Sequence, residues 1–184
     1  WAFADLLVIG AGPAGLLAAA SAARAGMRVI LVDEGTLAGG SLLDESALID
    51  DQPAAAFAAR LLAELQASPR VRVLTRATAF GAYDDQVIGV LQSTGSASAA
   101  SATAPGSACY ELLWRIHAPR IILATGAEQR PWVFDGNDRP GIMLGDAMRS
   151  YVNRFAVRPG RAVAVATHDA HGYRLVHDLA EQGV

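Results

Sequence analysis

The amino-terminal part of the chain alternates short apolar runs with an alanine-rich segment. Residues 6–9 and 28–32 are apolar runs bounded by glycine or an acid, which is the pattern of buried parallel strands. Between them, Pro13 to Ala25 is rich in Ala and Leu and is followed by Gly26, so a helix with a glycine stop is predicted. Together these segments predict a βαβ unit whose two strands are parallel.

The pattern of the remaining residues predicts further strands and helices. Helices are expected at residues 53–66, 146–155 and 172–182, and strands at residues 71–74, 86–91, 110–117, 120–124 and 161–166. Strands 86–91 and 110–117 are expected to be antiparallel. The segment that joins them, residues 93–108, consists almost entirely of Ser, Ala, Thr and Gly, which predicts a flexible loop.

The junction between the first strand and the first helix carries the glycine motif GxGxxG. The motif is Gly10-Ala11-Gly12-Pro13-Ala14-Gly15, and Asp33 ends the next strand. Gly10 would permit a tight turn, Gly12 would let the backbone approach a pyrophosphate, and Gly15 would let the helix pack close to the sheet. The helix start would offer free N–H groups to the pyrophosphate. Asp33 would bind ribose hydroxyls and repel a 2′-phosphate, so NAD or FAD is predicted in preference to NADP.

Three further segments are expected near the same ligand. Gly39-Gly40-Ser41 would supply additional backbone donors to the phosphates, with a flexible loop as the alternative. Residues 77–79 follow the third strand, where such folds meet the adenine with main-chain groups. Thr125-Gly126-Ala127 ends a strand at the sheet edge where ligands of open α/β sheets lie. A simple turn is the alternative for Gly126.

These patterns together predict a fold and a domain division. The fold is an α/β fold: a Rossmann-like parallel sheet with a three-layer FAD/NAD(P)-binding architecture, an antiparallel hairpin insertion, and the start of a second βαβ unit. Residues 1–158 would form the dinucleotide-binding domain, and residues 159–184 would begin a second, degenerate Rossmann-like domain. In that second unit, residues 167–172 lack two of the three glycines of a fingerprint, which argues against a second, exchangeable NAD(P)H.

Composition and charge exclude several classes of function. The net charge is −3 and all 15 basic residues are Arg, without a basic stripe, so neither nucleic acid nor a membrane surface is an expected partner. No apolar run is long enough for a membrane span, and a cytoplasmic location is expected. Cys109 is the single cysteine, so a CxxC dithiol is impossible. His168, Asp169, His171 and His177 lack zinc-like spacing, and no metal site is expected.

Several stretches resemble the α subunit of heterotetrameric sarcosine oxidase. They are residues 10–15, Val32-Asp33-Glu34 with Gly39-Gly40-Ser41, residues 123–131, Asn137-Asp138-Arg139-Pro140-Gly141-Ile142-Met143-Leu144, and Arg149-Ser150-Tyr151-Val152-Asn153-Arg154-Phe155. The first three occur in many flavoproteins, whereas the last two are more specific. The same stretches are similar to subunits of opine oxidase and hydrogen cyanide synthase. The chain begins at Trp1 without an initiator Met and is expected to be a fragment of such a subunit.

The resemblance implies an activity, a cofactor and partners. Enzymes of this kind demethylate sarcosine oxidatively to glycine and pass electrons to oxygen, giving hydrogen peroxide. The amine is oxidised on a flavin in the β subunit, and smaller subunits complete the hetero-oligomer. In the α subunit, NAD occupies an FAD-like site, with FAD as the alternative cofactor here. The residues that would line this nucleotide are Gly10, Ala11, Gly12, Pro13, Ala14, Gly15, Asp33, Glu34, Gly40, Ser41, Thr78, Thr125 and Gly126.

Two other functions fit the same residues. One is an FAD-binding subunit of an oxidoreductase that acts on an opine or another imino acid. The other is a non-catalytic assembly module that the nucleotide stabilises. In all three cases the chain itself is expected to contribute no catalytic residue.

Overall fold

The chain folds into two compact units, each with its own core. A computed structural model describes residues 1–94 and 111–184, so most of the loop expected at residues 93–108 lies outside the described residues. Unit 1 comprises residues 1–40 and 58–126, and unit 2 comprises residues 41–57 and 127–184. This grouping by contacts differs from the domain boundary expected at residue 158, which stays a prediction.

The first sheet of unit 1 is parallel, as the sequence predicts. Its strands lie in the order β10, β2, β3, β6 and occupy Ile121–Leu123, Leu6–Ile9, Val29–Val32 and Val71–Leu74. Leu7 of β2 pairs with Ile121 on one side and with Ile30 on the other. The two central strands are almost wholly buried. Buried parallel strands of this kind are covered on both faces, which explains their continuous apolar sequence.

The second sheet contains the predicted antiparallel pair. Its strands lie in the order β1, β9, β8, β7 and occupy Ala2–Phe3, Glu111–His117, Val87–Ser93 and Ala77–Tyr83. The pairs β7–β8 and β8–β9 are antiparallel, and β1 joins β9 in parallel. A short 3₁₀ turn, Asp84–Gln86, connects β7 to β8.

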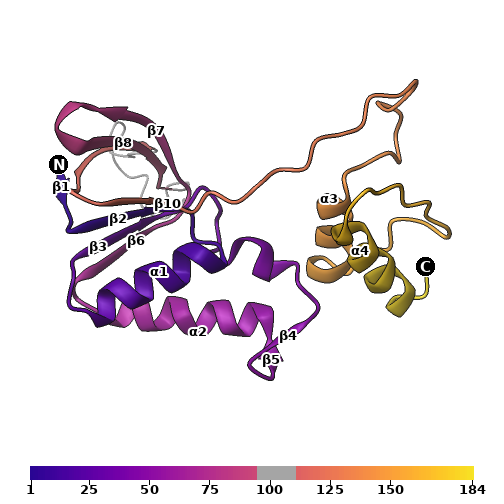
Figure 1. The fold of residues 1–184 in the computed structure, drawn as a ribbon, viewed down its shortest axis with the longest axis horizontal. Helices are drawn as coiled ribbons and strands as arrows, with labels where there is room; N and C mark the ends of the chain where they lie inside the picture. Colours follow the sequence, from indigo (N-terminus) through magenta and orange to yellow (C-terminus); the bar gives the residue numbers. More distant parts are fainter. Residues whose placement is uncertain (95–110) are drawn as a thin grey trace, which may run out of the picture. The chain divides into compact units, whose positions relative to one another are not determined.

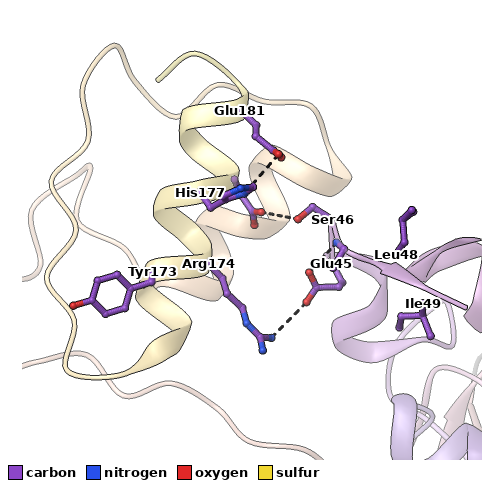
Figure 2. Close-up of a pocket in the computed structure, with 10 residues that line it drawn as sticks. Glu45, Ser46, Leu48, Ile49, Tyr173, Arg174, His177 and Glu181 are labelled. Atoms are coloured by element: carbon purple, nitrogen blue, oxygen red, sulfur yellow. Dashed lines mark hydrogen bonds and ion pairs between the residues drawn. The ribbon is translucent and has the colours of Figure 1, made fainter. Parts of the chain in front are cut away.

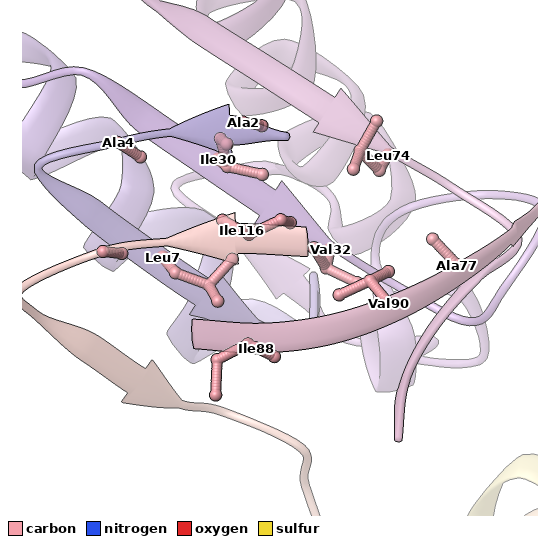
Figure 3. Close-up of a cluster of buried hydrophobic side chains, with 11 residues drawn as sticks. Ala2, Ala4, Leu7, Ile30, Val32, Leu74, Ala77, Ile88, Val90 and Ile116 are labelled. Carbon is pink, nitrogen blue, oxygen red and sulfur yellow. The ribbon is translucent and has the colours of Figure 1, made fainter. Parts of the chain in front are cut away.

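The apolar core of unit 1 lies between its two sheets (Figure 3). Leu7, Ile30 and Val32 reach it from the parallel sheet, and Val90 and Ile116 reach it from the antiparallel sheet. Val90 and Ile116 are fully buried. Ile88 and Val90, two residues apart in β8, and Ile116 in β9 thus lie on the sheet face that packs on this core.

Two helices complete the layers of unit 1. Figure 1 shows α1 (Pro13–Arg24) and α2 (Ala54–Ala67) on the side of the parallel sheet opposite to β7 and β8. Residues 54–57, the first turn of α2, belong to unit 2. Arg24 of α1 forms an exposed ion pair with Glu64 of α2 at 2.6 Å. The predicted three-layer arrangement is thus confirmed, with the parallel sheet as the middle layer.

Unit 2 is largely helical. Its elements are η1 (Gly40–Leu43, whose first residue is counted with unit 1), the short pair β4 (Leu48–Ile49) and β5 (Gln52–Pro53), α3 (Gly145–Arg149), the π-helix η3 (Ser150–Arg154) and α4 (Ala170–Glu181). Met148, Val152, Leu175 and Leu179 form its core. Among all the helices described, none has the length and apolar character required to cross a membrane.

One strand prediction for unit 2 is wrong. Residues 161–166 do not form a strand, although helix α4 of the expected second βαβ unit is present. Val163 and Val165 alternate with exposed residues and pack on the helical core. The alternation that suggested a strand is therefore real, but within the described parts of the chain no neighbouring strand offers this segment a hydrogen-bonded ladder.

Candidate functional site

Glycines join the end of β2 to the start of α1 by a turn that larger residues could not make. Gly10 has a φ of +103°, and a Cβ at this position would collide with the carbonyl oxygen of Ala124. A Cβ at Gly15 would collide with the carbonyl oxygen of Gly10. Gly10 therefore permits the turn beneath the end of β10, and Gly15 permits the close packing of helix on strand that the sequence predicts.

Gly12 differs from its neighbours because it faces open space. It occupies the N-cap position of α1 with φ −71° and ψ −172°, a conformation that any residue can adopt. No described atom lies within 4 Å of the position of a Cβ at Gly12. Among the described residues no side chain caps α1, and its first turn contains no acidic residue.

The start of α1 therefore presents backbone donors. Leu16 donates its N–H to the Gly12 carbonyl oxygen at 2.9 Å, which is the first hydrogen bond of the helix ladder. Pro13 has no N–H, and the N–H groups of Ala14 and Gly15 precede that first bond. An anion in front of Gly12 would meet these N–H groups and the positive end of the helix dipole.

The Asp33 carboxylate lies against the glycine loop and stabilises it by a hydrogen bond. One carboxylate oxygen accepts a hydrogen bond from the Ala11 N–H at 2.5 Å, and the other accepts from the Gly35 N–H at 2.8 Å. Each oxygen keeps a further lone pair for another donor. The neighbouring Glu34 is exposed. Asp33 thus has a structural contact that its sequence position did not suggest, in addition to its predicted contact with a ribose.

The second glycine pair packs directly on the first loop. The Gly39 N–H donates to the Ala11 carbonyl oxygen at 2.8 Å. Gly40 has a φ of +51°, and a Cβ there would lie 2.8 Å from the Gly12 Cα. The structure therefore brings Gly40 next to the Gly12 backbone of the fingerprint. Ser41 is exposed and is grouped with unit 2.

Two further predicted residues lie at neighbouring strand ends. The Ala124 N–H donates to the Ile9 carbonyl oxygen at 2.7 Å, and the exposed Thr125 follows it, two residues after the end of β10. The Ala77 N–H donates to the Asp33 carbonyl oxygen at 2.8 Å, which places Thr78 one residue from that contact. Thr78 belongs to β7, a strand that the sequence analysis missed.

The site also contains residues that no sequence pattern indicated. The Gly35 N–H binds one oxygen of Asp33, and the Ala124 carbonyl oxygen occupies the position that a Cβ at Gly10 would need. Both act through backbone atoms, so their side chains carry no information about the role. Gly126 has a φ of +75°, is exposed, and has no described atom within 4 Å of its Cβ position.

The start of α4 contrasts with the start of α1. The Asp169 carboxylate caps α4 by accepting hydrogen bonds from the N–H groups of His171 at 3.0 Å and Gly172 at 3.4 Å. Burial would raise the pKa of Asp169, but these hydrogen bonds, with that from Thr167, outweigh it and lower the pKa. A carboxylate thus occupies the donors at this helix start that a phosphate would need.

A group of possible metal ligands lies on α4. His177, Asp178 and Glu181 place their ligand atoms within 4.8 Å of one another. They line an open cleft of about 750 Å³ beside Glu45 and Ser46, all within unit 2 (Figure 2). Both oxygens of Asp178 already accept hydrogen bonds, one from Ser46 and the other from Arg149 of α3 and Asn153 of η3. These contacts account for Asp178 without a metal ion.

The glycine loop, the uncapped helix start and the acid at the next strand end define a protein of the dinucleotide-binding α/β class. The chain belongs to the pyridine nucleotide-disulphide oxidoreductase family, which it matches over residues 4–164. This confirms the predicted fold class and assigns the chain to a family of oxidoreductases.

Known proteins confirm the narrower resemblance. The chain is 53% identical to the sarcosine oxidase alpha subunit of Rhizobium meliloti (strain 1021), a match that covers 100% of this chain and 18% of that protein. It is 30% identical to an opine oxidase subunit of Agrobacterium tumefaciens (strain Ach5), over 99% of this chain and 35% of that protein. The crystal structure of L-proline dehydrogenase from P. horikoshii superposes with a TM-score of 0.77 at 25% identity, over 98% of this chain and 34% of that one. The chain thus spans about a fifth of its sarcosine oxidase relatives.

Proposed function

We propose that this chain is the dinucleotide-binding part of an amine-oxidising flavoenzyme subunit, of the sarcosine oxidase α type, and that it holds NAD in an FAD-like site. The observation that carries the proposal is the open space in front of Gly12 at an uncapped helix start, with Asp33 at the end of the adjacent strand. Phosphate recognition needs backbone donors that side chains do not cover, and these residues meet that requirement.

Each candidate residue, all in unit 1 except Ser41, would bind one part of a dinucleotide. The pyrophosphate would lie over Gly12 and accept from the helix N–H groups that follow Pro13, with the Gly40–Ser41 segment supplying further donors. Asp33 and Glu34 would bind ribose hydroxyls. Thr78 would lie on the adenine side, and Thr125 and Gly126 would border the remaining half of the ligand. The complete set is the fingerprint residues Gly10, Ala11, Gly12, Pro13, Ala14 and Gly15 together with these seven.

The role of the chain in this proposal is to bind and orient the nucleotide. A bound nicotinamide or flavin would supply hydride chemistry, whereas the residues of this chain hold the phosphates and ribose and exclude a 2′-phosphate. A ligand at 100 times its Kd adds about 2.7 kcal/mol to the free energy of unfolding, so a tightly held NAD would also stabilise the protein.

The proposed reaction and partners follow from the sarcosine oxidase relatives. The complete enzyme would demethylate sarcosine oxidatively to glycine and reduce oxygen to hydrogen peroxide. A flavin-bearing β subunit would oxidise the amine, and smaller subunits would complete a heterotetramer in the cytoplasm. The similarity to an opine oxidase subunit supports an alternative, an FAD-binding subunit that acts on an opine. A flavin absorbs at about 450 nm and NAD does not, so an absorption spectrum of the purified protein distinguishes the two cofactors.

A single substitution tests the site. The backbone conformation of Gly12 suits any residue, and a Cβ there would have no described atom within 4 Å, so Gly12→Val is expected to fold normally but to bind no dinucleotide. Gly160→Val is the matched control, because its Cβ would have only ordinary contacts, at 3.5 Å from the Ala162 carbonyl oxygen in unit 2. Nucleotide content is measured in the protein purified in its native assembly. Full nucleotide content in Gly12→Val would reject the proposed site.

A further inference from the structure

Arg76 has a backbone conformation that residues with a side chain usually avoid. It is exposed and has a φ of +50°. Glycine, and less often Asn, adopts this left-handed region at little cost. Four other described residues with a positive φ lie in tight turns between paired strands, at Asp50–Asp51 and Asp85–Gln86. Arg76 lies instead where the chain passes from β6 in one sheet to β7 in the other, so no hairpin requires its conformation.

Hydrogen bonds on both sides fix the backbone at Arg76. The Arg76 N–H donates to the Gly35 carbonyl oxygen at 2.9 Å, and the Arg76 carbonyl oxygen accepts from the Ser93 N–H at 2.9 Å. The preceding Thr75 carbonyl oxygen accepts from the Gln92 side-chain amide at 3.2 Å. The neighbouring segments therefore impose the positive φ, and the identity of the side chain at this position does not.

The same contacts place Arg76 beside the acid of the candidate site. Gly35, whose carbonyl oxygen accepts from Arg76, donates its own N–H to the Asp33 carboxylate at 2.8 Å. The next residue, Ala77, donates its N–H to the Asp33 carbonyl oxygen at 2.8 Å. All these residues belong to unit 1. Arg76 is therefore a direct neighbour of the Asp33–Gly35 turn, proposed to bind the ribose, and lies two residues before Thr78, proposed to lie on the adenine side.

The Arg76 side chain is available to a ligand. Within residues 1–94 and 111–184 it takes part in no ion pair and no cation–π contact. We infer that Arg76 is a further nucleotide-binding residue, whose planar guanidinium packs on the adenine ring of the bound dinucleotide. A guanidinium suits this role because it stacks on aromatic rings and keeps its charge. The inference rests on the proposed function, and it adds a side-chain contact where the sequence predicts main-chain contacts with the adenine.

The test removes the side chain and relaxes the backbone in one substitution. In Arg76→Gly, the Kd for NAD is expected to rise about tenfold, the size of one lost stacking contact with a base. This Kd is measured by titration calorimetry on the protein in its native assembly, after its bound nucleotide is removed. Without nucleotide, the Tm of the variant should be at least that of the wild type, because glycine adopts a φ of +50° without strain. A purely structural arginine would instead lower the Tm and leave the Kd unchanged.

Asp85→Gly is the matched control. Asp85 is also exposed, has a φ of +58°, and lies in the turn at the opposite end of β7 from Arg76. Glycine should relax the backbone there as well, but the Kd for NAD should equal that of the wild type. AMP and nicotinamide mononucleotide then locate the contact. Arg76→Gly should weaken AMP binding by the same factor as NAD binding, and it should leave nicotinamide mononucleotide binding unchanged. The adenosine half is common to NAD and FAD, so the AMP measurement serves for either cofactor.

The outcomes separate this inference from the proposed function. If the wild-type protein binds the dinucleotide and Arg76→Gly binds it and AMP equally tightly, the inference is overturned and the proposed function stands. Equal weakening in Arg76→Gly and Asp85→Gly would also overturn it, because backbone relaxation alone would then explain the loss. If Arg76→Gly does not fold, Arg76→Asn, which tolerates the same φ, is measured in its place with the same expectation. If the wild-type protein binds neither NAD, FAD nor AMP, the proposed function fails and the role of Arg76 fails with it.

Discussion

Replacement of Arg149 by Met should destabilise unit 2 strongly. The side chains of Arg149 and Asp178 are 9% and 3% exposed, and Met keeps most of the apolar stem of Arg while removing its charge. Burial would lower the pKa of Arg149, but the ion pair with Asp178 outweighs it and raises the pKa. Removing one partner of such a pair leaves a buried charge uncompensated, and we expect a loss of about 3 kcal/mol in the free energy of unfolding.

Thermal denaturation followed by circular dichroism measures this effect. For a chain of this length, a loss of about 3 kcal/mol corresponds to a fall in Tm of about 6–12 °C. Arg24→Met is the control, because the Arg24–Glu64 pair is 59% and 37% exposed and should give no resolvable shift. In the double variant Arg149→Met/Asp178→Leu, the loss in the free energy of unfolding should be smaller than the sum of the losses in the two single variants, by at least about 1 kcal/mol. Equal shifts in Arg149→Met and Arg24→Met would refute the reasoning.

Two further predictions concern unit 1. Gly15→Ala should cost about 3 kcal/mol or more, because its Cβ would collide with the Gly10 carbonyl oxygen; a Tm equal to that of the wild type would contradict this packing. Hydrogen bonds from the Arg28 side chain and then the Arg28 main chain lower the pKa of Asp5 from 3.8 to about 2. The ionised carboxylate therefore stabilises the fold above pH about 4, and this contribution is lost as the pH falls from there through about 2. An NMR titration of Asp5 should show this low midpoint, and Arg28→Met should return it toward 3.8; an unchanged midpoint in the variant would reject the assigned cause.

Much of the fold could be predicted because its signals are local. The strands β2 and β3 are continuous apolar runs, and α1 is bounded by a proline and a glycine. The strand β7 was missed because small residues and Gly81 interrupt its apolar alternation, and its register shifts between Ala79 and Gly81. Residues 161–166 produced the opposite error, because their alternation reflects packing on helices and not pairing with a strand.

The candidate site was predicted less completely than the fold. The fingerprint glycines and Asp33 follow from spacing, since each residue type serves one geometric need. Gly40 lies against Gly12, and Ala124 lies against Gly10, in each case through backbone atoms. No side-chain pattern in the sequence therefore indicates these contacts. The same holds for Arg149, whose carboxylate partners lie in two separate segments with no characteristic spacing.

The central claim is that the space in front of Gly12 receives a dinucleotide pyrophosphate. Mass spectrometry of the small molecules released when the purified protein is denatured tests this claim most directly, with Gly12→Val measured in parallel. We predict about one equivalent of NAD, or of FAD, from the wild-type protein and none from the variant. Release of no dinucleotide by the wild-type protein, or of equal amounts by both proteins, would contradict the account.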